Sequence, residues 1–314
     1  MGSGTELAGR LRAGDLRAAP AVLNLVESAV PADRDQTAAL LSALPTEPAG
    51  HIVGLTGPPG VGKSTLLSEL VAGWRARGRT VAVLAVDPSS RRSGGALLGD
   101  RARIRTAPDD PGVFVRSTAA GEQLGGLAPA TRAAGHALAV AWDVVVIETV
   151  GVGQSETDVA DVADTVAVVV QPGSGDVLQF LKSGIMEIPD VLVVNKADLG
   201  SVALRTRRDL RAALRSLGAR DTAVIAVSSL PPPQGIDELL DALDAHSQRL
   251  DLPARRLAAR RHHALADFVV EHGAAGLRAL GGRRAAQSWL AAQPPGLDVA
   301  ALTAGLARLT GRGE

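Results

Sequence analysis

A glycine-rich turn between an apolar strand and an amphipathic helix constrains the fold of this chain more than any other feature. The turn runs from Gly57 to Ser64 with the spacing G-x-x-x-x-G-K-S. Its glycines let backbone N–H groups wrap a phosphate, and the N-terminus of the following helix adds partial positive charge. A glycine turn without function rarely has both flanking elements. The segment therefore predicts the P-loop of a nucleoside triphosphatase.

Short apolar runs alternate with amphipathic segments from His51 onward, as in a parallel sheet covered on both faces. The predicted strands are 51–56, 80–86, 113–116, 143–148, 165–171, 191–195 and 223–227. The predicted helices are 63–77, 129–141, 155–162, 176–186, 202–217 and 236–247. We therefore predict an α/β P-loop fold with a mostly parallel central sheet flanked by helices.

Helical patterns precede and follow this region. We predict three parts: an N-terminal helical extension over 1–49, a P-loop domain over 50–250 and a C-terminal helical segment over 251–314. The last segment is rich in Arg and Ala, with breaks at 281–282 and 294–295. Its arginine pairs, Arg255-Arg256 and Arg260-Arg261, predict a solvated or dimer-facing stripe, and His262-His263 predicts an exposed or interfacial pair rather than a metal site.

The composition excludes several classes of protein. Acidic and basic residues balance at 33 each, unlike the strongly basic face of a nucleic-acid-binding protein. The absence of cysteine excludes disulfides and thiolate metal sites. No apolar run approaches the roughly 20 residues that span a bilayer, and the N-terminus lacks the pattern of a secretory signal. We therefore expect a cytoplasmic protein that binds neither membrane nor nucleic acid.

Lysine is scarce, because the chain has only Lys63, Lys182 and Lys196. Where an Arg-rich chain keeps lysine, a compact ammonium on a flexible stem is needed rather than a planar guanidinium. Lys63 is expected to bridge the β- and γ-phosphates, and the Ser64 hydroxyl to bind Mg²⁺. The predicted phosphate contacts are Gly57, Pro58, Pro59, Gly60, Val61, Gly62, Lys63, Ser64 and Thr65.

A second motif, N-K-x-D, selects guanine over adenine. Asn195-Lys196-Ala197-Asp198 directly follows an apolar strand, at the edge of a parallel sheet where ligands bind. The Asp198 carboxylate can accept hydrogen bonds from N1–H and the exocyclic amine of guanine, which adenine lacks. The stem of Lys196 would lie along the base, and Asn195 would tie neighbouring loops together. Ser228 and Ser229, after the last strand, fit a second base-contacting loop.

Three acidic residues end or follow predicted strands at the same edge: Asp87, Asp100 and Glu148. Mg²⁺ takes octahedral oxygen coordination, usually with one or two carboxylates plus hydroxyl, phosphate and water oxygens. Together with Ser64 they are the candidate metal ligands. Three acids exceed the usual need, so some would act through water or in one nucleotide state. The alternative for each is a solvated acid at a strand end.

The segment Glu148–Gly151 stands where most GTPases carry D-x-x-G, and Val152 follows it. A glutamine at that next position would orient the attacking water. Its absence predicts slow intrinsic hydrolysis, accelerated by a partner or by rearrangement. Gln154 is the substitute candidate. The predicted catalytic set is Lys63, Asp87, Glu148, Gln154 and Lys182.

Several further runs combine with the two nucleotide motifs: Gly14–Arg17, Leu25–Glu27, Val86–Ser90, Ser93–Gly95, Leu98–Arg101, Glu148–Glu156 and Gly173–Glu187. In these runs the chain resembles the MeaB/ArgK-type GTPases over about residues 5–245. Proteins of this family are chaperones of adenosylcobalamin-dependent acyl-CoA mutases such as methylmalonyl-CoA mutase. The run E-T-V-G-V-G-Q-S-E carries the most specific part of the resemblance.

The resemblance implies a GTP- and Mg²⁺-dependent homodimer that docks on a mutase, gates delivery of adenosylcobalamin from an adenosyltransferase and helps eject damaged cofactor. Asp87, Asp100 and Glu148 match the magnesium and switch acids of the family, and Lys182 matches a lysine of a further loop that signals to the mutase. Two departures concern partner contact. Gly121-Glu122-Gln123 replaces an Arg-Gly-His type segment, and Ser183 replaces a second lysine.

Two other functions share the P-loop architecture. A metal-insertion GTPase of the nickel type would carry His- or Cys-rich segments, and this chain has no cysteine and no histidine tract. A kinase linked to amino-acid transport would need a phosphoacceptor site, which no motif supplies.

Overall fold

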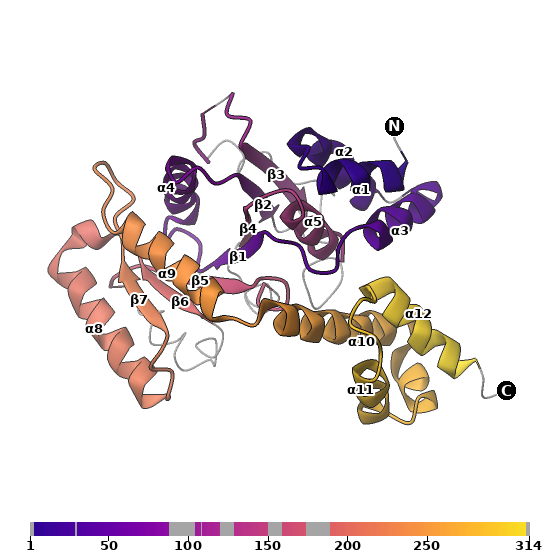
Figure 1. Cartoon of the computed structure of the whole chain (residues 1–314). Helices are drawn as coiled ribbons and strands as arrows, with labels where there is room; N and C mark the ends of the chain where they lie inside the picture. Colours follow the sequence, from indigo (N-terminus) through magenta and orange to yellow (C-terminus); the bar gives the residue numbers. More distant parts are fainter. Residues whose placement is uncertain are drawn as a thin grey trace, which may run out of the picture.

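The computed structural model describes residues 3–28, 30–87, 104–107, 109–119, 129–149, 159–173 and 189–311. These residues form a seven-stranded sheet in the order β3-β2-β4-β1-β5-β6-β7, with every neighbouring pair parallel (Figure 1). The strands are β1 (His51–Thr56), β2 (Val81–Asp87), β3 (Val113–Ala119), β4 (Val144–Thr149), β5 (Thr165–Val170), β6 (Val191–Val194) and β7 (Ala223–Ala226). The predicted α/β P-loop fold is confirmed.

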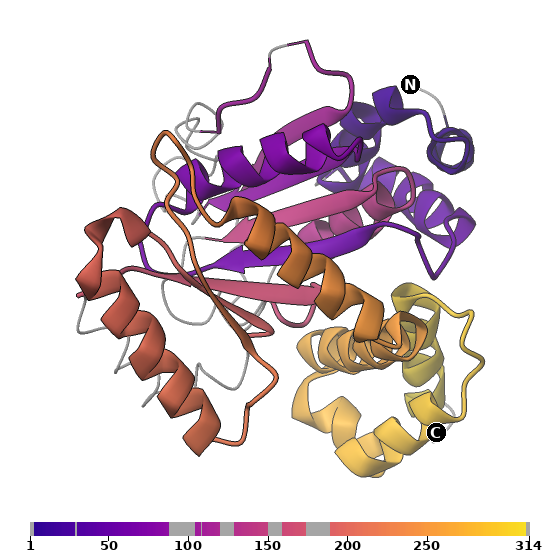
Figure 2. The ribbon, with the colours of Figure 1, turned by 60° about the vertical axis from the view of Figure 1, so that its left-hand side comes forward.

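Strands β1, β4, β5 and β6 are buried along their whole length, as expected for a parallel sheet covered on both faces. Alternate residues enter different cores: Val53 and Leu55 of β1 face one side, and Ile52 faces the other. Helices α4 (Lys63–Ala76) and α9 (Ile236–Arg249) cover the first face and lie across the front of Figure 2.

The second face is covered by α5 (Pro129–Ala139) and α8 (Ser201–Ser216) together with the N-terminal helices. The latter are α1 (Gly4–Arg12), α2 (Ala19–Val26) and α3 (Arg34–Ala43), with short 3₁₀ turns between them. Leu11 and Leu23 are fully buried in the same core as β4 and α5. The N-terminal extension therefore shares a hydrophobic core with the sheet.

The C-terminal helices are α10 (Leu252–Ala279), α11 (Arg283–Ala291) and α12 (Val299–Thr310). They enclose a separate small core around Phe268, Leu290 and Leu306. The predicted breaks at 281–282 and 294–295 separate these helices, as expected. Among the described residues no helix is both long and apolar enough to cross a membrane.

One predicted helix is wrong in its described part. Residues 159–162 of the predicted helix 155–162 form turns, and the rest of that helix and all of 176–186 lie outside the described residues. The turns lead directly to Asp164, a buried carboxylate just before β5 that accepts a hydrogen bond from the Ile52 backbone N–H (2.9 Å). Strands β4 and β5 both run parallel to β1. After β4 the chain must therefore return to the starting edge of the sheet and reverse its direction before it enters β5.

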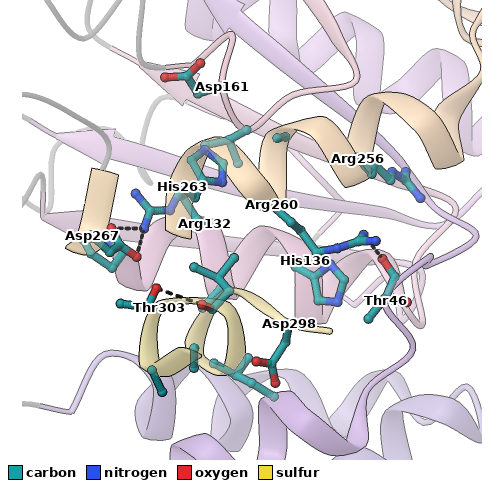
Figure 3. Close-up of a pocket in the computed structure, with 18 of the residues that line it drawn as sticks. Thr46, Arg132, His136, Asp161, Arg256, Arg260, His263, Asp267, Asp298 and Thr303 are labelled. Atoms are coloured by element: carbon teal, nitrogen blue, oxygen red, sulfur yellow. Dashed lines mark hydrogen bonds and ion pairs between the residues drawn. The ribbon is translucent and has the colours of Figure 1, made fainter. Parts of the chain in front are cut away.

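The prediction for the arginines of α10 was a solvated or dimer-facing stripe, and its solvated form is wrong for Arg256 and Arg260. The Arg256 guanidinium donates to both carboxylate oxygens of Asp164 (2.9 and 2.6 Å) and to the Gly50 carbonyl (2.7 Å). Arg260, which is buried, donates to the carbonyls of Thr46 (2.8 Å) and Pro295 (2.9 Å), and Figure 3 shows it reaching toward Thr46. These side chains attach the C-terminal helices to the amino-terminal edge of the sheet.

Histidines at this junction are buried and neutral. His263 lies on α10, is 8% exposed and faces Arg132 of α5. Of the predicted exposed or interfacial pair, only His262 is therefore exposed. Burial and the charge of Arg132 lower the pKa of His263 to about 3. Burial likewise lowers the pKa of His51 to about 4, and its Nε2 lies 2.8 Å from the Thr165 hydroxyl.

These lowered pKa values predict acid sensitivity. In the unfolded chain both histidines take up a proton as the pH falls below about 6.5, whereas in the folded chain the pKa is about 4 for His51 and about 3 for His263. Stability is therefore full above pH 6.5 and is lost as the pH falls, by up to ~1.4 kcal/mol per pH unit for each histidine. Urea denaturation at pH 6.5 and 5.0 should show this loss.

The variant His263→Gln should lose less stability between pH 6.5 and 5.0 than the wild-type protein, because one titrating group is gone. His262→Gln changes a neighbour whose side chain is 60% exposed, and it should keep the wild-type pH dependence. A His263→Gln variant with the wild-type pH dependence would contradict the burial argument.

Candidate functional site

The turn after β1 contains three glycines whose backbone conformations favour that residue, and one of them packs directly on the sheet. Gly57 has φ +143°, and a Cβ built on it would lie 2.1 Å from the carbonyl oxygen of Val169 in β5. Gly60 (φ +80°) and Gly62 (φ +93°) also adopt left-handed conformations. A loop of this kind turns several backbone N–H groups toward one point, which makes a concave anion site.

Lys63 begins α4 and is buried beneath this turn. Its Nζ donates to the carbonyls of Gly57 (2.7 Å) and Pro58 (3.1 Å). No side chain of the described segments caps α4, so the N–H groups of its first turn face the loop. The ammonium group and the helix N-terminus therefore concentrate positive charge at the loop.

A hydroxyl and a carboxylate meet beside the turn. The Ser64 hydroxyl donates to Glu148 Oε1 at 3.0 Å, and Glu148 is 5% exposed near the end of β4. Strand β4 lies between β1 and β2, so Asp87, the last residue of β2, ends at the same edge. This gives two candidate oxygen ligands in contact, with the backbone of a second acid, Asp87, on the neighbouring strand.

The guanine motif is built into the same edge by Asn195, which is 2% exposed. Its Nδ2 donates to the Val61 carbonyl of the P-loop (2.8 Å), and its Oδ1 accepts from the Ser229 hydroxyl (3.1 Å). Asp198 is exposed, and its Oδ1 accepts from the buried Ser228 hydroxyl at 2.9 Å. The three loops predicted to surround a nucleotide are thus joined by hydrogen bonds.

Lys196 connects these loops in a second way. It has φ 57°, a conformation rare for residues other than glycine, and its Nζ donates to the Gly60 carbonyl at 2.9 Å. The same Nζ donates to the side-chain oxygen of Gln171, directly after β5. Sequence reasoning missed Gln171, although its place at the carboxyl end of a buried strand is a usable signal.

Three of the predicted site residues, Asp100, Gln154 and Lys182, lie outside the described residues. The side chain of Asp87 does as well, although its backbone completes β2. The predicted residues that the structure does bring together are Gly57–Thr65, Glu148, Asn195, Lys196, Asp198, Ser228 and Ser229.

Comparison with known proteins agrees with this geometry. The family model described as "Methylmalonyl Co-A mutase-associated GTPase MeaB" matches residues 19–275. The chain belongs to this family. The resemblance seen in the motifs is confirmed, and membership of the MeaB family identifies the chain as a guanine-nucleotide-binding GTPase.

Individual relatives support the assignment. A Pyrococcus abyssi protein that carries the name GTPase is 43% identical over 82% of this chain and 80% of its own length. The "methylmalonic aciduria type A homolog, mitochondrial" of Caenorhabditis elegans is 35% identical over 78% of this chain and 67% of its own. The crystal structure of an LAO/AO transport system kinase superposes with a TM-score of 0.67 at 28% identity, covering 97% of this chain and 96% of that one.

A cavity of about 640 Å³ lies elsewhere in this MeaB-family protein, between α5, α10 and α12 (Figure 3). Ile52 at the start of β1 lines it, whereas the P-loop follows the end of β1. Its charged groups include two intramolecular pairs, Arg132 with Asp267 (2.7 Å) and Arg256 with Asp164 (2.6 Å). The cavity is therefore separate from the candidate nucleotide site.

Two glycines of the P-loop give a matched test of this geometry. Gly57→Ala should lower the urea midpoint strongly, because its Cβ would meet a backbone oxygen of β5 that cannot swing aside. Gly60→Ala also places alanine in a left-handed conformation, at a cost of about 1–2 kcal/mol, but its Cβ meets no atom within 4 Å. Equal midpoints for the two variants would contradict the close packing of Gly57 on β5.

Proposed function

We propose that this MeaB-family GTPase is a Mg²⁺-dependent chaperone of an acyl-CoA mutase such as methylmalonyl-CoA mutase. In this proposal its nucleotide state gates the loading of adenosylcobalamin into the mutase and protects the mutase from damaged cofactor. The observation that carries the proposal is the convergence of the P-loop, Glu148 and the Asn195–Asp198 loop at one edge of the sheet in a chain of this family.

In the proposed site, the backbone N–H groups of 57–62 and the N-terminus of α4 hold the β-phosphate. Lys63 exchanges its bonds to the loop carbonyls for the β- and γ-phosphates, so the ammonium remains paired throughout. Asp198 accepts two hydrogen bonds from guanine, with Ser228 fixing the carboxylate. Lys196 lies along the base, while Asn195 and Ser229 keep its loop against the P-loop.

The residues beside the P-loop fit a magnesium ion. Ser64 and Glu148 present a hydroxyl and a carboxylate oxygen 3.0 Å apart, and hard oxygen donors are the ligands that Mg²⁺ prefers. When bound, the ion would neutralise developing phosphate charge. Asp87 and Asp100 would complete the acid set, directly or through water. Glu148 would exchange its contact with Ser64 for the ion, so both groups would hold it.

We propose that intrinsic hydrolysis is slow. Val152 stands at the position where a glutamine would orient the attacking water, and it offers no hydrogen-bonding group. Gln154 is the nearby side chain that could supply this function once a partner binds. Lys182 is the proposed signalling residue toward the mutase.

The proposed partner follows from the family and from one relative. The family is described as mutase-associated, and the Caenorhabditis elegans relative is named for methylmalonic aciduria. We further propose that the protein acts as a cytoplasmic homodimer through its C-terminal helices and receives cofactor from an adenosyltransferase. Ordering of loops around the γ-phosphate and their release after hydrolysis would convey the nucleotide state to the mutase.

The base assignment is tested by Asp198→Asn. The amide presents an N–H where guanine also donates, so GTP affinity should fall by about 100-fold or more. The same amide can donate to the C2 carbonyl of xanthine. Xanthosine triphosphate should therefore bind the Asp198→Asn variant more tightly than it binds the wild-type protein. Asp221→Asn, which changes another exposed acid, is the control. Calorimetry with both nucleotides measures the change, and unchanged GTP affinity would refute the role of Asp198.

The partner assignment is tested by adding purified methylmalonyl-CoA mutase of the same organism to a GTP hydrolysis assay. The rate should rise several-fold, because docking would place the missing water-positioning group. The variant Lys63→Ala should show no hydrolysis with or without mutase. If no acyl-CoA mutase of the organism changes the rate of GTP hydrolysis, the chaperone proposal is refuted, whereas the GTPase assignment is unaffected.

A further inference from the structure

Helix α8 carries a local excess of positive charge in a chain of zero net charge. Its sequence, SVALRTRRDLRAALRS, holds five arginines and one aspartate. Arg205, Arg208, Arg211 and Arg215 are exposed, whereas Arg207 pairs with Glu238 at 3.3 Å. Within the described part of the chain, no carboxylate pairs with Arg205, Arg208 or Arg215. Counting only the described residues, the outer face of α8 therefore carries an excess of positive charge, with Asp209 as the one acid of the helix.

The spacing of these arginines opposes helix stability. Arg205 and Arg208 are three residues apart, as are Arg208 and Arg211, while Arg211 and Arg215 are four apart. Residues at these spacings are neighbours on a helix surface, and like charges there repel. The burial of Ala203, Leu210 and Leu214 against the sheet holds the helix in place. An anionic surface laid across α8 would relieve the repulsion.

Exposed aliphatic side chains gather around the same helix. Of the eight large hydrophobic side chains that are exposed among the described residues, four lie on α8 or within two residues of its ends, and a fifth lies in the loop after β7. They are Leu199, Val202, Leu204, Leu217 and Leu230, between 47% and 60% exposed. Leu204 and Arg208 are four residues apart and share one side of the helix. A surface that mixes arginine with exposed aliphatic groups is typical of protein interfaces.

This surface adjoins the guanine motif. Leu199 follows Asp198, and Leu230 follows Ser229. The bond between the Ser228 hydroxyl and Asp198 (2.9 Å) holds these two loops side by side. Both views place α8 at the end of the molecule opposite α11 and α12 (Figures 1 and 2). A protein seated on α8 would touch the loops that hold the base and would lie far from the C-terminal helices.

We propose that the outer face of α8, extended by Leu199 and Leu230, is the docking surface for an acidic patch on the partner mutase. The proposal rests on the mutase partnership proposed above and adds the surface that makes it. Arginine supplies charge complementarity for the acidic patch, and the aliphatic side chains supply apolar contact. A nucleic acid would use the arginines but would leave the aliphatic side chains in water. The protein partner therefore accounts for both observations.

Charge reversal tests the surface. The triple variant Arg205→Glu, Arg208→Glu and Arg215→Glu changes exposed residues outside the nucleotide site. The control triple Arg12→Glu, Arg34→Glu and Arg249→Glu makes the same charge change on exposed residues of α1, α3 and α9, outside both α8 and the C-terminal helices. Both full-length variants and the wild-type protein would be measured by biolayer interferometry, with GTP present, against immobilised methylmalonyl-CoA mutase of the same organism.

The α8 variant should bind the mutase about 10-fold or more weakly, and the control should bind within about two-fold of the wild-type protein. Wild-type binding should weaken as salt rises, and the α8 variant should lose most of that dependence. Basal GTP hydrolysis should be unchanged in both variants, which also shows that they are folded. The single variant Arg208→Glu gives a smaller loss in the same direction if the triple variant does not fold.

The outcomes separate the two proposals. Equal mutase binding by the α8 variant and the wild-type protein overturns the docking surface alone. Absence of wild-type binding to the mutase overturns the partnership and the docking surface with it. If the α8 variant keeps mutase binding but loses binding to a 20-base-pair DNA or RNA duplex, α8 is a nucleic-acid surface. A change only in the monomer–dimer equilibrium assigns the face to a second copy of this chain.

Discussion

The buried carboxamide of Asn195 is the interaction on which the candidate site depends. It joins the P-loop, through the Val61 carbonyl, to the loop after β7, through the Ser229 hydroxyl. A carboxamide suits this position because it donates and accepts at once, whereas a carboxylate could not donate to Val61. The protein's own hydrogen bonds thereby hold the separate loops in one arrangement, which lowers the entropic cost of binding a nucleotide there.

The sheet explains why one amide can reach both loops. Strand β1 lies between β4 and β5, and β6 follows, so the P-loop and Asn195 emerge two strands apart at one edge. Gly57 narrows that gap further, because its missing Cβ lets the turn approach β5. The parallel register thus brings together residues separated by more than 130 positions in the sequence. The proposed phosphate, metal and base contacts therefore meet at one edge of the sheet.

At the opposite edge, where the parallel strands begin, the sheet is attached to the C-terminal helices. Asp164 accepts from the Ile52 backbone and from Arg256, so one buried carboxylate joins β1 to helix α10. Its side chain is 3% exposed, and that of Arg256 is 12% exposed. Breaking such a pair would leave a buried charge without its partner, a change that typically costs 3–5 kcal/mol. The C-terminal helices are therefore anchored where they cannot obstruct the nucleotide.

The sequence was sufficient for the strands and the nucleotide loops because their patterns are local. A run such as Thr165–Val170 is β-branched and apolar, and the two nucleotide motifs each follow such a run. The sequence did not predict that the side chains of Arg256 and Arg260 point inward and bind carbonyl oxygens. Their spacing of four residues marks a polar helix face, but the pattern does not show that buried carbonyls face it. Gln171 was missed for a related reason, since its partner Lys196 comes from another strand.

Arginine has different roles on the two arginine-rich helices, α8 and α10, because its surroundings differ. On α10, Arg256 and Arg260 point inward, and carbonyl oxygens and Asp164 satisfy the guanidinium groups. On α8, Arg208 and Arg215 point outward, and the sheet offers no acid to pair with them among the described residues. A guanidinium that already has its partners strengthens the fold, whereas one without partners favours recognition of an anionic surface. Since α8 follows directly from the guanine motif, recognition there can be coupled to the nucleotide without any contact to the phosphates.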